Sequence, residues 1–146
     1  MKALGKRLEI EKHVKWPGFV QYKDLPVYYG LASAFVHPAK EEAWGLVLNE
    51  AAASGLPILA GSAVGARFEL LEEGTNGHTF DAYSDTDIAV TLEKTSRLSQ
   101  DRLSDMGEAS RRIVAAWGTA RFGSGLREAL RKTGVIASTD KAVTEI

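Results

Sequence analysis

Short apolar runs alternate with helical patterns along most of the chain. Two short apolar runs, Ala34–Val36 and Leu56–Ala60, predict strands buried in a sheet, and a turn cluster at residues 73–77 predicts a third strand around His78–Phe80. Apolar residues at helical spacing predict helices at Leu46–Ser54, around Phe68 to Leu71, and at Asp87–Leu98, Gln100–Trp117 and Phe122–Lys132. Strands that alternate with helices through short connections are typical of a parallel sheet built from βα units.

The two ends of the chain have weaker patterns. Near the start, the spacing predicts a helix at Leu4–Val14, and a strand at the edge of a sheet at Trp16–Val20, where Pro17 cannot donate to a ladder. A short helix is expected at Leu25–Leu31, with Asp24 as its N-cap. Residues 134–146 are small and polar and predict a disordered tail, so the expected organisation is one α/β domain over residues 1–133.

Composition narrows the class of protein. The 146 residues suffice for one domain, and a net charge of −1 without a basic cluster argues against nucleic-acid binding. The chain has no cysteine, no apolar run near the length of a membrane span and no signal-peptide pattern, which favours a cytoplasmic protein without a transmembrane segment. The histidines His13, His37 and His78 lack metal-ligand spacing, so neither a metal nor a cofactor is expected.

Two glycine-bearing loops each follow a predicted strand. The first runs from Glu41 to Gly45 and the second from Gly61 to Gly65. Because the carboxyl ends of parallel strands share one edge, and ligands of such sheets bind outside that edge, both loops are expected to form the site. Gly45 lets the backbone approach a ligand, and the helix after it presents free N–H groups and a positive dipole end, which suit a diphosphate.

Two glutamates stand on either side of this glycine. Glu42 lies in the loop and can accept hydrogen bonds from hydroxyl groups, whereas Glu50 lies inside the helix beside Ala51, Ala52 and Ala53. A carboxylate among apolar neighbours needs partners, and sugar hydroxyls would supply them. Taken singly, each glutamate is equally compatible with a surface charge or a residue favoured by the helix dipole.

Glu42 and Glu50, with seven residues between them, match the E-x7-E motif of the large family of retaining glycosyltransferases with the GT-B fold. The surrounding His37-Pro38, Gly45-Leu46-Val47 and Gly55-Leu56-Pro57 resemble the signature of this family, known as glycosyl transferases group 1 or family 4. The resemblance covers roughly residues 14 to 115 and is most specific from 36 to 60. It implies a Rossmann-like three-layer α/β domain with a parallel sheet, the partial C-terminal half of a GT-B fold with extra C-terminal helices.

The resemblance also implies roles for single residues. Glu42 is the catalytic residue beside the donor sugar, and Glu50 binds the ribose hydroxyls. The other donor-binding positions are Trp44, Gly45, Leu46 and Val47 by their backbone amides, Phe19 and Val20 beside the base, and Gly65 in the second glycine loop. The family loop carries two glycines and a proline, whereas Ala66 and Phe68 here replace one glycine and the proline.

The implied function is the donor-binding domain of a retaining, metal-independent glycosyltransferase, with a nucleotide diphosphate sugar as substrate and an acceptor that the sequence does not identify. The acceptor-binding N-terminal domain and the upstream phosphate-binding Arg and Lys of the family have no counterpart before Met1. A missing or separate N-terminal domain is therefore an expected partner. An unpaired sheet edge predicts self-association, measurable by light scattering. The expected location is the cytoplasm, or peripherally the inner face of the membrane.

Two alternatives stay open. The chain could be a non-catalytic remnant that binds nucleotide sugar or mediates oligomerisation. It could also be a plain flavodoxin-like α/β domain whose glutamates are surface charges, because a fold alone does not determine function. The presence of both Glu42 and Glu50 favours the glycosyltransferase and the binding remnant over the plain flavodoxin-like domain.

Overall fold

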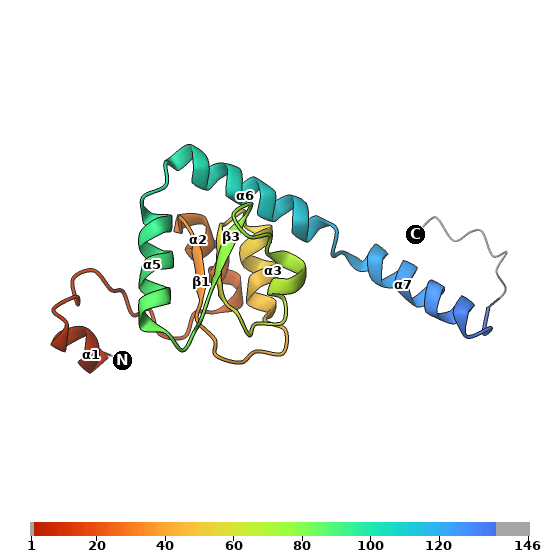
Figure 1. Ribbon diagram of the computed structural model, residues 1–146, viewed down its shortest axis with the longest axis horizontal. Coiled ribbons are helices and arrows are strands. Elements are labelled where there is room, and N and C mark those ends of the chain that lie inside the picture. The colour runs from red at the N-terminus through yellow and green to blue at the C-terminus, as the bar shows by residue number, and fades with distance from the viewer. Residues whose placement is uncertain (1, 137–146) are drawn as a thin grey trace. The chain divides into compact units, whose positions relative to one another are not determined.

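The computed structural model describes residues 2–136, which fall into two compact units that divide between Leu31 and Ala32. The first unit contains α1 (Lys2–Arg7), the 3-10 turn η1 (Tyr22–Asp24) and α2 (Leu25–Leu31). The second contains three strands, β1 (Phe35–His37), β2 (Ile58–Gly61) and β3 (Gly77–Phe80). Its helices are α3 (Leu46–Ala53), α4 (Arg67–Leu70), α5 (Asp85–Ser96), α6 (Gln100–Ala115) and α7 (Thr119–Lys132) (Figure 1).

In the first unit, the predicted bounds of α2 are confirmed, but two other predictions are wrong. Asp24 is not an N-cap, because it ends the 3-10 turn that continues directly into α2. The helix predicted at Leu4–Val14 stops at Arg7. It stops there because Glu9 adopts a left-handed φ of 56°, and the Ile10 N–H turns back to donate to the Gly5 carbonyl at 3.1 Å.

The strand predicted at Trp16–Val20 is also wrong. No other strand among residues 2–136 pairs with this segment, which runs without regular secondary structure. A strand needs a partner for its backbone groups, and Pro17 has no N–H to offer to one. The domain boundaries 1–133 stay a prediction. Residues 137–146 of the predicted tail lie outside the described residues, and in the part before them the Val135 N–H donates to the Leu130 carbonyl at 2.9 Å.

The second unit is built on a parallel sheet in the order β1-β2-β3. Phe35 pairs with Ile58, and Ile58 pairs with Gly77 across the other edge of the central strand. β2 is buried at every position, as expected for a central parallel strand with helices on both faces. The predicted parallel sheet is therefore confirmed.

Helices cover both faces of this sheet, which gives the three predicted layers (Figure 1). Ile58 and Ala60 point to one face and pack with Leu48 of α3 and Leu70 of α4. Leu59 points to the other face, where its cluster includes Phe80 of β3 and Ile88 of α5. Alternate residues of β2 thus supply both cores, because successive side chains of a strand point to opposite faces.

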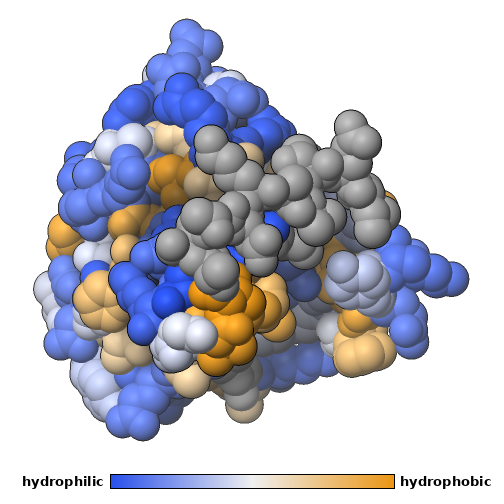
Figure 2. All heavy atoms as spheres, turned by 90° about the vertical axis from the view of Figure 1, so that its right-hand side faces the viewer, coloured by the Kyte–Doolittle hydropathy of each residue, from blue (hydrophilic) through white to orange (hydrophobic). Residues whose placement is uncertain are grey.

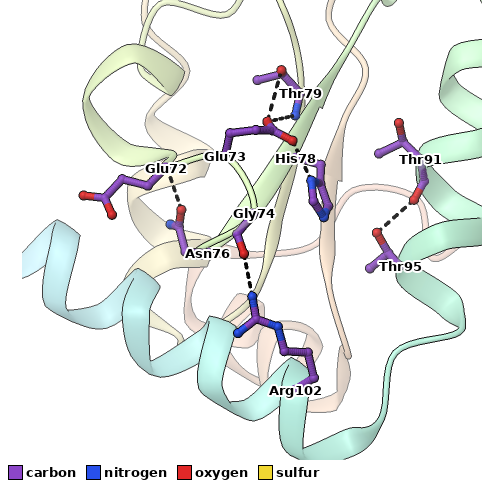
Figure 3. Close-up of polar contacts among 9 residues, drawn as sticks. All are labelled: Glu72, Glu73, Gly74, Asn76, His78, Thr79, Thr91, Thr95 and Arg102. Carbon is purple, nitrogen blue, oxygen red and sulfur yellow. Dashed lines mark hydrogen bonds and ion pairs between the residues drawn. The ribbon is translucent and has the colours of Figure 1, made fainter.

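A buried amide joins segments that lie far apart in sequence, and Figure 3 shows its contact with Glu72. Asn76 is fully buried; its Nδ2 donates to the Leu70 carbonyl at 2.9 Å and to Ser110 Oγ at 3.1 Å, and its Oδ1 accepts from the Glu72 N–H at 2.7 Å. Ser110 Oγ donates in turn to the Leu56 carbonyl at 2.7 Å. The network fixes α6 against the segments that lead into β2 and β3.

A second polar cluster holds the turn before β3 (Figure 3). The Glu73 carboxylate lies 2.6 Å from His78 Nδ1 and accepts from the Thr79 N–H at 2.9 Å. Burial alone would raise the pKa of Glu73, but the hydrogen bonds from His78 and Thr79 and the charge of His78 outweigh it and hold the pKa below its ordinary value. The Arg102 guanidinium donates to the Gly74 carbonyl at 2.5 Å, which ties the same turn to α6.

Candidate functional site

Two loops meet at the carboxyl edge of the sheet. One follows β1 and contains Glu42, and the other follows β2 and contains Gly65. The Gly65 N–H donates to the Glu42 carbonyl at 2.9 Å, and the Ala66 N–H donates to the Trp44 carbonyl at 2.8 Å. A parallel bridge between Glu42 and Val64 completes the contact. The two loops predicted to share this edge therefore form one hydrogen-bonded surface.

Gly65 permits this contact because it carries no side chain. A Cβ placed on Gly65 would lie 2.0 Å from the Ala43 carbonyl oxygen and 2.9 Å from its carbon, far inside van der Waals contact. Neither atom is the end of a flexible side chain that could move aside. Two backbones therefore approach each other closely at Gly65, although Ala66 and Phe68 depart from the family pattern.

Gly45 turns the first loop into α3. Its φ of +95° and ψ of 67° lie in the left-handed region, which a residue with a side chain rarely adopts. Immediately after it, α3 begins at Leu46, and the first N–H groups of a helix have no acceptor inside the helix. Gly45 thus places the positive end of α3 directly behind the loop that carries Glu42, an arrangement that suits an anion.

The two motif glutamates differ in exposure. The Glu42 side chain is exposed and lies beside Gly45, since a Cβ placed on Gly45 would be 3.3 Å from Glu42 Cγ. Glu50 is half-buried in the second turn of α3, and its backbone carbonyl accepts from the Ser54 N–H at 3.0 Å and from Ser54 Oγ at 2.8 Å. The loop glutamate is thus open to a ligand, and the helical one is held on a regular element.

The predicted backbone contacts come from a segment that its own side chains anchor. The Trp44 indole Nε1 donates to Asn49 Oδ1 at 3.0 Å, and its ring lies 5.9 Å from the ring of Trp117, which follows α6. Val47 packs against the core, whereas Leu46 is exposed. The side chains of Trp44 and Val47 thus anchor the segment, and its backbone contacts the second loop through the Trp44 carbonyl.

Three residues at this edge were not among the predicted site residues. His37 ends β1, and its Nε2 is buried without a hydrogen-bond partner among the described residues, 3.7 Å from where a Cβ on Gly45 would lie. Two cations also lie here: Lys40 of the first loop lies over the Tyr83 ring, and Arg67 at the start of α4 donates to the Ser62 carbonyl at 2.6 Å. The position of His37 at the end of a predicted strand is the one sequence feature that marks it as a site residue. No sequence pattern indicates the contacts of Lys40 and Arg67.

Phe19 and Val20, expected beside the base, belong to the first unit. Phe19 is 87% exposed and Val20 is half-buried there. Within residues 2–136, no group of three or more His, Asp or Glu side chains is arranged to hold a metal ion. In the same part of the chain, no helix is both long enough and apolar enough to cross a membrane.

Comparison with known proteins agrees with this architecture. Mannosylfructose-phosphate synthase of Agrobacterium fabrum is 30% identical over 119 residues, which are 80% of this chain and 26% of that protein. A GDP-mannose-dependent alpha-(1-6)-phosphatidylinositol monomannoside mannosyltransferase of Mycobacterium tuberculosis is 28% identical over 90% of this chain and 36% of its own length. The crystal structure of Anabaena HepE in complex with UDP and glucose superposes with a TM-score of 0.74 at 24% identity, over 90% of this chain and 35% of HepE.

The structural neighbours confirm the predicted fold, the Rossmann-like domain of GT-B glycosyltransferases. The chain spans about a quarter to a third of the length of these relatives. Residues 1–113, more than three quarters of the chain, match the model of a family described as glycosyl transferases group 1. This protein is therefore a member of the group 1 glycosyl transferases.

Proposed function

We propose that this chain is the donor-binding domain of a retaining, metal-independent glycosyltransferase that transfers a sugar from a nucleotide diphosphate sugar. One observation carries the proposal: Gly65 and Ala66 bind the loop of Glu42 and Trp44, and this joined surface lies in front of the start of α3. Backbone N–H groups at a helix start are a common site for phosphate groups. The bound UDP and glucose of HepE, which shares the fold, support the same ligand class.

Each site residue has a proposed task. Glu42, exposed beside Gly45, contacts the donor sugar at its reacting end and is the catalytic residue. Glu50 accepts hydrogen bonds from the ribose hydroxyls, and the backbone of Trp44 to Val47 binds the sugar and the diphosphate. Phe19 and Val20 border the base. Fixed donors at the diphosphate would stabilise the charge that develops on the leaving group, which requires no metal ion or other cofactor.

A non-catalytic nucleotide-sugar-binding domain is the second candidate. Binding alone needs no more than the joined loops and the helix start described above. One outcome is that the isolated chain binds the donor without turnover. If an added acceptor domain then restores turnover, the result supports the glycosyltransferase function of the two domains together. Binding without turnover in both cases would support the binding module.

Calorimetric titration of the chain with UDP, GDP and their sugar conjugates tests the proposal. We expect one of the two nucleotides to bind at a single site, because the helix start and the glycine loops form one anion-binding surface. A chain that binds neither nucleotide nor any conjugate would contradict the donor-binding function.

Glu50→Ala separates the role of the ribose contact from that of the diphosphate contact. We expect nucleotide affinity to fall by about 10- to 100-fold, because hydrogen bonds to a charged group contribute about 1.5–3 kcal/mol. Glu93→Ala is the matched control, since Glu93 is exposed on α5 and pairs with Arg97, the residue that follows the helix. An affinity unchanged by Glu50→Ala would remove Glu50 from the ribose role.

We also propose that the chain self-associates and that it binds an acceptor domain. β1 is an edge of the described sheet, and beside it lies a hollow of about 450 Å³ whose apolar lining includes Val36, Leu59 and Leu92. Unpaired edges and apolar hollows favour contact with a further chain. Light scattering is expected to show dimers or larger species, and a monomer at all concentrations would contradict this. The proposed location is the cytoplasm, or the inner face of the membrane.

A further inference from the structure

The imidazole of His37 has a buried nitrogen that lacks a hydrogen-bond partner. Hydrophilic side chains cover much of the face shown in Figure 2, where water can bond to their polar atoms. Water does not reach His37 Nε2, and no atom of residues 2–136 forms a hydrogen bond with it. Because an unpaired buried polar group destabilises the fold, such a group in a native protein indicates a partner that arrives later.

The nitrogen lies beneath the loop that carries Glu42. A Cβ placed on Gly45 would lie 3.7 Å from His37 Nε2, 3.3 Å from Glu42 Cγ and 3.2 Å from Val64 Cγ1. The three side chains therefore surround one point. Val64 is aliphatic, so of the two neighbours of the imidazole only Glu42 carries an acceptor, the carboxylate on the carbon after Cγ.

The imidazole is held in place, whereas the carboxylate is free to turn. His37 ends β1 and pairs with Ala60, and its ring is stacked on that of Phe35 with the ring centres 6.3 Å apart. The Glu42 carbonyl accepts from the Gly65 N–H, but the exposed Glu42 carboxylate has no hydrogen bond or ion pair among the described residues. Rotation of the Glu42 side chain towards Gly45 would thus bring an acceptor to a fixed donor.

We propose that His37 is a positioning residue for Glu42: once the donor sugar is bound, the Nε2–H donates to the Glu42 carboxylate and holds it beside the sugar. This inference rests on the proposed function, in which Glu42 contacts the donor sugar. Without a ligand, water solvates the exposed carboxylate. A bound sugar displaces that water, and a carboxylate that loses water needs another donor. A hydrogen bond from an imidazole N–H to a carboxylate is charge-assisted and therefore strong.

A direct contact between His37 Nε2 and the diphosphate is the other use of this nitrogen. The geometry favours Glu42, because atoms of this chain close Nε2 off beneath Gly45 while the Glu42 side chain already lies beside it. The two uses differ in what the loss of the N–H does. Loss of a diphosphate contact weakens nucleotide and sugar conjugate alike, whereas loss of Glu42 positioning weakens only the conjugate.

Calorimetry of His37→Phe with UDP, UDP-glucose, GDP and GDP-mannose tests this difference. Phenylalanine keeps a ring against Phe35 but has no N–H. We expect the affinity for the sugar conjugate to fall by about 10-fold, as for one hydrogen bond to a charged group, and the affinity for the nucleotide alone to stay unchanged. His37→Gln should keep most of the conjugate affinity, because the glutamine amide also donates. The double variant His37→Phe/Glu42→Gln should bind the conjugate as tightly as Glu42→Gln does.

NMR of the imidazole nitrogens gives a readout that a packing role would not move. The conjugate should shift the His37 Nε2 resonance to that of a protonated, hydrogen-bonded nitrogen, and the nucleotide alone should not. The His37 signal is identified by its absence in His37→Phe. His78 is the internal control, because its Nδ1 is already paired with Glu73 in the turn before β3. The urea midpoint of His37→Phe should not fall, since the change removes an unpaired buried polar atom.

His13→Phe is the matched control, because His13 is exposed in the first unit and the chemical change is the same. It should leave both affinities unchanged. Equal losses for nucleotide and conjugate in His37→Phe, or an unchanged conjugate affinity, would overturn the positioning role and leave the donor-binding function standing. A lowered urea midpoint with an unmoved His37 resonance would identify a packing role and equally overturn it. An unsubstituted chain that binds none of the four compounds would overturn the donor-binding function itself.

Discussion

Gly65→Ala is expected to abolish measurable nucleotide binding and to lower the free energy of unfolding by about 3 kcal/mol, the upper range for overpacking of a close contact. The new Cβ would lie 2.0 Å from the Ala43 carbonyl oxygen, so one loop must move away from the other. That movement breaks the hydrogen bonds from Gly65 to Glu42 and from Ala66 to Trp44, which hold the two loops together.

Calorimetry with the nucleotide and urea unfolding followed by circular dichroism measure the two effects of Gly65→Ala. Gly123→Ala serves as the control, because it lies inside α7 and a Cβ there meets nothing within 4 Å. It should leave nucleotide binding unchanged and stabilise the helix by up to about 1 kcal/mol. If Gly65→Ala bound the nucleotide as tightly as the unsubstituted chain, the joined loops would not be the binding surface.

Asn76→Ala is expected to cost about 3 to 5 kcal/mol of the free energy of unfolding. Asn76 is fully buried, and its amide satisfies the Leu70 carbonyl, the Ser110 hydroxyl and the Glu72 N–H. Truncation to alanine leaves these buried polar groups without that partner and opens a cavity. Both unsatisfied buried polar groups and cavities are known causes of large destabilisation.

Urea unfolding of Asn76→Ala should therefore show a midpoint far below that of Asn49→Ala. Asn49 accepts a single hydrogen bond, from the Trp44 indole, and is only half-buried. Its removal should cost about 1 kcal/mol, the usual net contribution of one hydrogen bond. Similar losses for the two variants would show that the Asn76 network does not hold the segments before β2 and β3.

The predicted helices and strands are confirmed where a pattern within a few consecutive residues specifies the element. The run Leu56–Ala60 overlaps β2, and the pattern from Leu46 ends within one residue of α3, because a buried strand and an amphipathic helix both have local signatures. The prediction failed at Trp16–Val20, where an extended, partly apolar segment has no partner among the described strands. Pairing is a property of two segments, and the sequence of one does not reveal it.

In the candidate site, too, some features follow from local sequence and others depend on contacts between distant segments. The spacing of Glu42 and Glu50 and the position of Gly45 before a helix lie within one short segment, so the sequence alone identifies this loop. The hydrogen bond that holds this loop in place could not be predicted from local sequence, because the Gly65 N–H donates to the Glu42 carbonyl across 23 residues of chain. The burial of His37 Nε2 beneath Gly45 likewise depends on how that loop closes.

By itself, the sequence determined the parallel α/β class, the order of its elements from β1 onward and the two loops at its carboxyl edge, because hydrophobic periodicity and glycine positions act over a few residues. The tertiary structure alone decided which backbones touch. Gly65 against Ala43 and Asn76 against Ser110 are contacts between distant segments, which close packing of the folded core imposes and no local pattern encodes.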